Sequence, residues 1–277
     1  MDQQCESRSD FHHHQIGHLF VGRSSVKRTV RTPSGNPSQV RRVPINTERT
    51  SSRLPDDRLW QPVTAKWFFV VFGASLVYAV VRYHCSGEVA WTHFPLFIFN
   101  KIISLAAIIF IACSYLMGRV IRWHNSNPKT KLVVIKFCGL MGFSLALVHA
   151  FFSVCLLTPA YFGKFFAEDG RLNLVGELGL AFGVIALWAV AIPAITTLPM
   201  MPKAIGGTRW KRSQRMGYLC LILVLIHMLV FGIKGWLAPA GWPLALPPIS
   251  LWAAAAAAIP LVARLWQSFG KTGVAAR

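Results

Sequence analysis

A chain of 277 residues that is 54% hydrophobic and only 14% charged has too little polar surface for a water-soluble domain. Its mean hydropathy of +0.46 likewise indicates an integral membrane protein. The net charge of +19 would suit a nucleic-acid-binding protein, but the positive charge lies mostly in tails and alternate loops, and no motif for binding nucleic acid is present. We therefore expect membrane lipid, and no nucleic acid, as a partner.

The N-terminal region, residues 1–61, is polar and rich in Ser, Arg, Gln, Asn and Pro, which predicts a disordered basic cytoplasmic tail. No short apolar core follows the first residues, so we do not expect a signal peptide. The cluster of His12, His13, His14 and His18 would hold a transition metal only weakly. A solvated low-complexity patch is the better interpretation.

Six apolar segments follow, and each is near or above the roughly 20 residues that cross the hydrocarbon core of a bilayer. They predict an all-α fold, a six-helix transmembrane bundle over 62–268, with a short cytoplasmic tail at 269–277. The segments run at roughly 63–82, 96–117, 132–158, 173–197, 215–236 and 248–267.

Loop charge predicts the orientation of the bundle. The loops 118–131 and 198–215 carry several Lys and Arg residues and no acid, whereas 84–95 has no Lys or Arg and 159–172 is balanced. Because positive loops stay on the cytoplasmic side, both termini are expected in the cytoplasm. We expect the membrane to be a bacterial inner membrane.

Two histidines lie inside apolar segments that run in the same direction, His149 in the third and His227 in the fifth. Ionisable side chains at such depth are costly and are functional by default. Each lies about nine residues before the outer end of its segment, so both are expected at one depth, where two facing imidazoles suit a six-coordinate haem iron. Gly142 and Ala146 on the His149 face would give a flat macrocycle clearance. The alternative is that each histidine only links helices by hydrogen bonds.

The stretches 143–167 and 208–236 resemble the ferric reductase-like transmembrane domain family, which includes the STEAP metalloreductases and MsrQ-type haem subunits. The pattern W-x(3)-QR-x-GY-x(8)-H at 210–227 carries much of the likeness. The resemblance implies a six-helix bundle in which His149 and His227, on the third and fifth helices, bind the iron of b-type haem. It implies one haem, because the positions where family oxidases carry a second histidine pair hold other residues here: Ile135, Lys136, Ser213, Gln214 and Arg215.

The resemblance also bears on the redox partners. No GxGxxG or other nucleotide motif is present, so we expect a separate reductase or other redox partner protein. A flavin, FAD or FMN, at the cytoplasmic mouth would have its phosphates held by a basic cluster composed of Arg209, Lys211, Arg212 and Arg215, with Arg119 and Arg122. The preferred interpretation of these residues is that they are ordinary positive-inside residues. Membrane quinol is an alternative donor. Near the outer side, Lys101, Arg82 or Lys164 would pair with haem propionates, although simple snorkelling explains each as well.

The sequence thus predicts an oxidoreductase subunit that carries electrons from a cytoplasmic donor (flavin, reductase or quinol) to an outer acceptor such as ferric ion or a partner oxidoreductase. The alternatives are a non-redox membrane transporter, or a structural or sensor protein that uses the same bundle.

Overall fold

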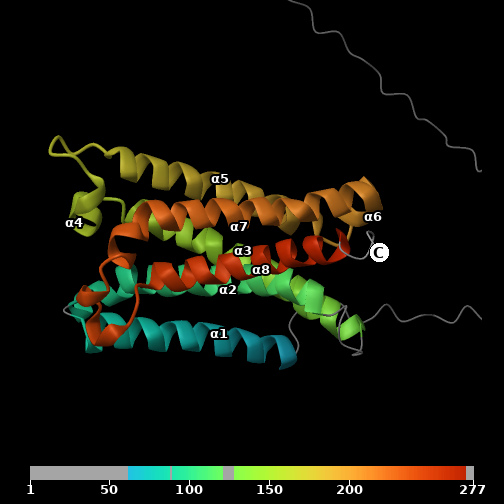
Figure 1. The fold of residues 1–277 in the computed structure, drawn as a ribbon, viewed down its shortest axis with the longest axis horizontal. Coiled ribbons are helices and arrows are strands. Elements are labelled where there is room, and N and C mark those ends of the chain that lie inside the picture. Colours follow the sequence, from blue (N-terminus) through green and yellow to red (C-terminus); the bar gives the residue numbers. More distant parts are fainter. Residues whose placement is uncertain (1–61, 88, 121–127, 273–277) are drawn as a thin grey trace, which may run out of the picture. The chain divides into compact units, whose positions relative to one another are not determined.

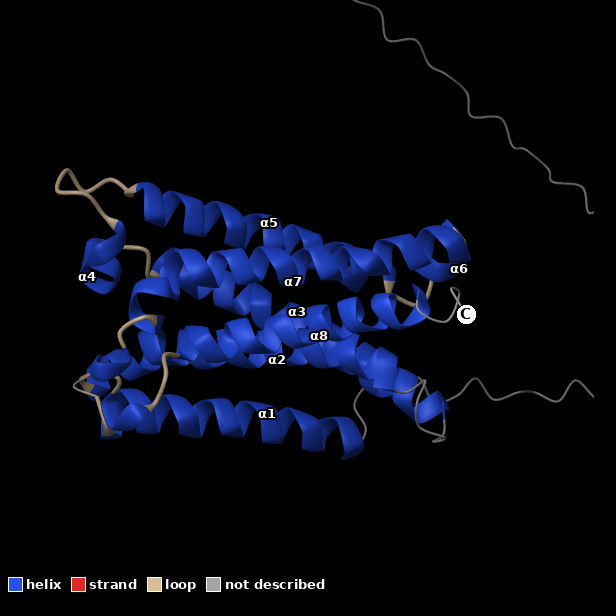
Figure 2. Cartoon of the chain, in the orientation of Figure 1, coloured by secondary structure: helices blue, strands red, loops and turns tan. Residues whose placement is uncertain are grey.

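A computed structural model describes residues 62–87, 89–120 and 128–272 of the chain. The predicted N-terminal tail, with its histidine cluster, lies outside the described residues. The described part is almost entirely helical, and Figures 1 and 2 show long helices joined by short loops. Its one bridge outside helices is an isolated antiparallel pair between Phe166 and Leu172. The all-α prediction is confirmed.

Six helices are long and apolar enough to cross a membrane, as the hydropathy pattern predicted. They are joined by two short helices, α4 (Pro159–Phe162) and α6 (Met201–Ile205). The six long helices are α1 (Pro62–Val80), α2 (Phe99–Val120), α3 (Pro128–Cys155), α5 (Leu174–Thr196), α7 (Gly207–Trp236) and α8 (Ile249–Thr272).

The main difference from the predicted segments is at the start of α7. This helix begins at Gly207, eight residues before the apolar segment predicted at 215–236, so half of the predicted basic loop 198–215 belongs to α7. Hydropathy marks where the chain is apolar, whereas a helix satisfies its own backbone hydrogen bonds in water as well as in lipid. The basic residues of this region therefore lie on the first turns of a long helix.

Successive long helices run in opposite directions, so α3 and α7 are parallel to each other (Figure 1). We call the two ends of the bundle the α4 end and the α6 end, after the short helix at each. α1 begins and α8 finishes at the α6 end. This agrees with an even number of crossings; that the α6 end faces the cytoplasm stays a prediction.

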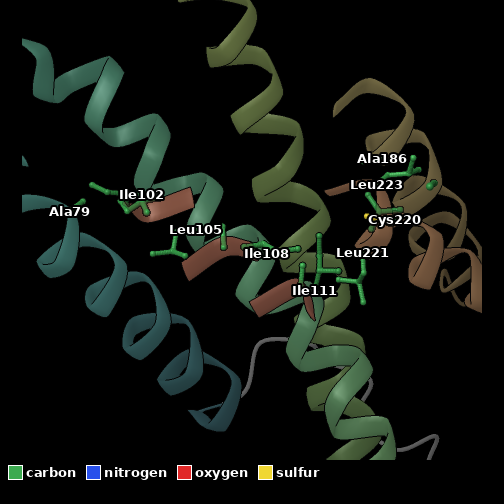
Figure 3. Close-up of a cluster of buried hydrophobic side chains, with 14 of the residues drawn as sticks. Ala79, Ile102, Leu105, Ile108, Ile111, Ala186, Cys220, Leu221 and Leu223 are labelled. Carbon is green, nitrogen blue, oxygen red and sulfur yellow. The ribbon is translucent and has the colours of Figure 1, made fainter. Parts of the chain in front are cut away.

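Helix α2 is the most buried of the six and forms the centre of the packing. Ile102, Leu105, Ile108 and Ile111 follow one another along it with helical spacing, and Figure 3 shows them between α1 and Leu221 of α7. α3 packs mainly against α2, and α7 packs mainly against α5 and α8, whereas α3 and α7 make few direct contacts. The two histidine-bearing helices are therefore held by their neighbours and not by each other.

The outward faces of the long helices are apolar and exposed, as expected for surfaces that meet lipid. Phe151 of α3 and Trp188 of α5 are 66% and 71% exposed, and the same holds for Phe69 of α1. In a soluble protein such a surface would cause aggregation. These faces support contact with the hydrocarbon core.

Candidate functional site

A cavity of about 590 Å³ lies inside the bundle and is lined by α2, α3, α5, α7, α8 and the segment around α4. His149 and His227 both line it, from the two helices that make few direct contacts with each other. Most of the lining is apolar, and Cys220, two turns before His227, is part of it. The volume is within the range of about 300–1,000 Å³ that is typical of small-molecule and cofactor pockets.

His149 is held by a polar pair in otherwise apolar surroundings. Its Nδ1 lies 2.8 Å from Oδ1 of Asn100 on α2 and 3.4 Å from Oγ of Ser153, one turn further along α3. The Asn100 Nδ2 donates to Ser153 Oγ over 3.0 Å. When the Asn100 oxygen accepts from Nδ1, the proton of the imidazole is on Nδ1 and its Nε2 keeps a free lone pair.

His227 is fixed by backbone. Its Nδ1 donates to the carbonyl oxygen of Gly179 on α5 over 2.7 Å, and a carbonyl can only accept, so Nε2 again has a free lone pair. The ring meets Phe231 edge to face at 4.8 Å. A Cβ at Gly183 would lie 3.0 Å from His227 Cε1, so the absence of a side chain there lets the ring lie against α5.

Gly179 and Gly183 form a close-packing face of α5, since a side chain on either would meet Phe231 or His227 of α7. Gly142, in contrast, does not face the cavity. A Cβ on Gly142 would lie 2.8 Å from the backbone nitrogen of Ile111, so this glycine serves the close approach of α3 to α2, and only Ala146 of the predicted pair lines the cavity. The prediction that Gly142 gives clearance to a macrocycle is wrong, because helix spacing alone does not show which neighbour a face meets.

Two of the three predicted outer cations reach the cavity. Lys101 and Lys164 line it, and Lys101 Nζ lies 4.5 Å from the centre of the Phe97 ring. Partial burial, followed by the positive charge of Lys101, lowers the pKa of Lys164. Arg82 instead donates from Nε to the Pro247 carbonyl over 2.8 Å and is not among the lining residues.

Neither lysine forms an ion pair with a carboxylate within the described part of the chain. Two neighbouring ammonium groups at one cavity favour an anion between or beside them. No group of three or more His, Cys, Asp or Glu side chains is placed to hold a metal ion among the described residues. Two histidines are fewer ligands than a bare ion usually takes from protein, so the arrangement suits a metal that arrives with ligands of its own.

The predicted basic cluster lies away from the cavity. Arg209, Lys211, Arg212 and Arg215 are all exposed on the first turns of α7 at the α6 end, and none lines the cavity. Of the two further residues assigned to this cluster, Arg122 and the side chain of Arg119 lie outside the described residues.

Other residues of the 210–227 pattern join helices. Trp210 Nε1 donates to the Thr196 carbonyl at the end of α5 over 3.0 Å, and Gln214 Nε2 donates to the Pro193 carbonyl over 3.2 Å. A Cβ on Gly217 would overlap the hydroxyl of Tyr115 on α2. The pattern therefore fixes the start of α7 against α5 and α2, while its last residue, His227, lines the cavity.

Sequence reasoning missed the groups that orient the two imidazoles. Asn100 is 4% exposed in the second apolar segment, and a buried carboxamide there was a visible signal. The Gly179 carbonyl left no signal in the sequence, because every residue has one.

Comparison with known proteins gives a distant likeness. No family model matches the chain. Metalloreductase STEAP2 of mouse and of human are each 25% identical to it over 166 residues, which cover 50% of this chain and 34% of the relative. The chain thus spans about a third of the length of these relatives. The match supports a distant relationship to STEAP and ferric reductase-like proteins and suggests a transmembrane redox role.

Proposed function

We propose that this chain is a haem b membrane protein that carries electrons across the bilayer, with His149 and His227 as the two axial ligands of one haem. The observation that carries the proposal is that both imidazoles line one cavity and each has its Nδ1 hydrogen-bonded, so that each can offer Nε2 to a metal. Histidines that bind a metal usually donate their other ring nitrogen to a hydrogen-bond acceptor in this way.

The other lining residues suit the same cofactor. The apolar walls would exclude water from a macrocycle, and Lys101 and Lys164 supply two positive charges for its propionate groups. Bound haem would supply a one-electron Fe(III)/Fe(II) couple. The protein would contribute ligand orientation, burial and the charge around the couple.

The direction of transfer follows from the predicted topology. With the α6 end in the cytoplasm, the exposed residues Arg209, Lys211, Arg212 and Arg215 lie where an anionic donor would approach, either a flavin (FAD or FMN) or a separate reductase. Membrane quinol is a further donor class. At the α4 end the electron would pass to ferric ion or to a partner oxidoreductase; reduction of a metal is the activity that the name of the similar STEAP2 proteins gives.

Absorption spectra of the purified full chain, oxidised and dithionite-reduced, test the proposal. Low-spin b-type bands are expected in the wild type and are expected to disappear in His149→Ala and in His227→Ala. His84→Ala is the matched control, since that ring stacks on Trp91 at 4.1 Å and does not line the cavity. A folded wild-type protein that takes up no haem would refute the proposal and favour a transporter or sensor.

A further inference from the structure

The two candidate ligands differ in what holds them. His227 donates to a backbone carbonyl, which can only accept a hydrogen bond. His149 faces a side-chain carboxamide, which can present either an oxygen or an NH₂ group. The first ligand is thus fixed by the fold, whereas the second depends on the identity and orientation of one side chain.

We propose that Asn100 is the positioning residue of the site: its oxygen holds His149 in the form that binds iron and sets how strongly that ligand donates electron density. The inference rests on the proposed function. It assigns to Asn100 a role through His149 and no contact with the cofactor. Its geometric basis is the 2.8 Å separation between Asn100 Oδ1 and His149 Nδ1.

Ser153 binds the other end of the carboxamide. The Asn100 NH₂ group donates to Ser153 Oγ over 3.0 Å, so the oxygen is turned toward His149. In the opposite orientation the NH₂ would donate to Nδ1, the imidazole proton would stay on Nε2, and no lone pair would remain for a metal. Ser153 lies one turn after His149 on α3, so the same helix fixes the position of the hydroxyl relative to the imidazole ring.

The surroundings make this pair unusual. Asn100 is 4% exposed within a helix otherwise rich in Ile, Phe, Leu and Ala, where a buried carboxamide is costly unless it is fully bonded. Its side chain forms hydrogen bonds with His149 and Ser153, both on α3. We infer that the residue is kept polar for the ligand and not for helix packing, which Val, Leu or Ile would serve as well.

The strength of the acceptor at Nδ1 controls the basicity of the ligand. A stronger acceptor makes the imidazole a better donor, stabilises Fe(III) and lowers the midpoint potential. Asn100→Asp is close in shape and a stronger acceptor, so it is expected to shift the reduction equilibrium toward Fe(III) by about tenfold, or about 59 mV for one electron. Asn100→Leu removes the acceptor, so we expect a shift in the opposite direction and weaker haem retention.

The test is a redox titration of the detergent-purified full chain, followed in the visible spectrum, with electron paramagnetic resonance of the oxidised form. Ser114→Ala is the matched control: Ser114 is also buried on α2, but its hydroxyl donates to the Ile111 carbonyl over 2.7 Å and it does not line the cavity. Its potential should equal that of the wild type. Ser153→Ala gives a second variant if Asn100→Asp does not fold, with a smaller shift in the direction of Asn100→Leu.

The outcomes separate this inference from the proposed function. A wild type with bis-histidine haem, together with Asn100 and Ser153 variants whose potentials match that of Ser114→Ala, would overturn the role of Asn100 and leave the haem proposal intact. A wild type that does not bind haem would remove both.

Discussion

Substitution of one glycine on α5 offers a direct test of the packing around the candidate site. A Cβ on Gly179 would overlap Cζ and Cε1 of Phe231 and would lie 2.8 Å from its Cε2, whereas ordinary contact begins near 3.4 Å, so the whole ring would have to move away from α5. The ring is held on one side by Phe165 at 4.3 Å and on another by His227 at 4.8 Å. Phe231 lines the cavity, so displacement would carry it toward the space assigned to the cofactor.

Gly179→Ala is therefore expected to cost about 1–3 kcal/mol of unfolding free energy, the usual range for overpacking. For a chain of this size that corresponds to a fall in Tm of about 2–12 °C. Haem content should fall as well, because the displaced Phe231 ring lines the cavity and contacts His227. Thermal unfolding in detergent and the haem-to-protein absorbance ratio measure the two effects.

Gly73→Ala is the matched control. Gly73 is in the interior of α1, and nothing lies within 4 Å of a Cβ built on it. Because alanine favours a helix over glycine by about 0.5–1 kcal/mol, this variant should be neutral or slightly more stable, with full haem content. If Gly179→Ala matches Gly73→Ala in both Tm and haem content, the argument that Phe231 and His227 are packed against the bare backbone of α5 is refuted.

Three further predictions concern other contacts. Gly217→Ala should lower Tm by several degrees because its Cβ would overlap both the hydroxyl and the ring of Tyr115. The loss should be smaller in a Tyr115→Ala background, which removes that ring, and equal losses in the two backgrounds would contradict this. Gln214→Ala should cost about 0.5–1.5 kcal/mol per lost hydrogen bond to the end of α5 and leave the haem spectrum unchanged, since Gln214 does not line the cavity. The pKa of Lys164 is lowered in the folded protein, so the unfolding free energy of the haem-free protein should rise as pH increases from that lowered pKa to the ordinary lysine value. Lys164→Gln should remove this pH dependence. A carboxylate bound beside Lys101 should weaken or reverse it.

Much of the architecture could be predicted because a helix that crosses the bilayer needs about 20 consecutive, mostly apolar residues. The fourth apolar segment, predicted at 173–197, is the helix Leu174–Thr196, since its two ends coincide with polar residues and turn signals. The start of α7 at Gly207 could not be found in this way, because the added turns carry charges that lie outside the hydrocarbon and leave no apolar signal. The equal depth of the two histidines in the membrane was predicted from a count of about nine residues between each histidine and the outer end of its segment. α7 ends nine residues after His227, as counted, but α3 ends only six residues after His149.

The candidate site, too, could be predicted from the sequence only in part. His149 and His227 stood out as ionisable residues in apolar surroundings, and the structure places both at one cavity. Their orientation depends on Asn100, which hydropathy treats as a minor exception, and on the carbonyl of Gly179, which any residue would supply. Side-chain identity reports which groups are available, but the pairing of a ring with a backbone oxygen 48 positions away is decided by helix packing.

The pairing of helices has a consequence for how the protein acquires its final form. α3 is packed with α2 and α7 with α5, and the parallel helices α3 and α7 make few direct contacts with each other. A metal ligated by His149 and His227 would add a direct link between α3 and α7, which are otherwise connected through α2, α5 and α8. The free energy of binding such a metal would then count as folding free energy of the bundle.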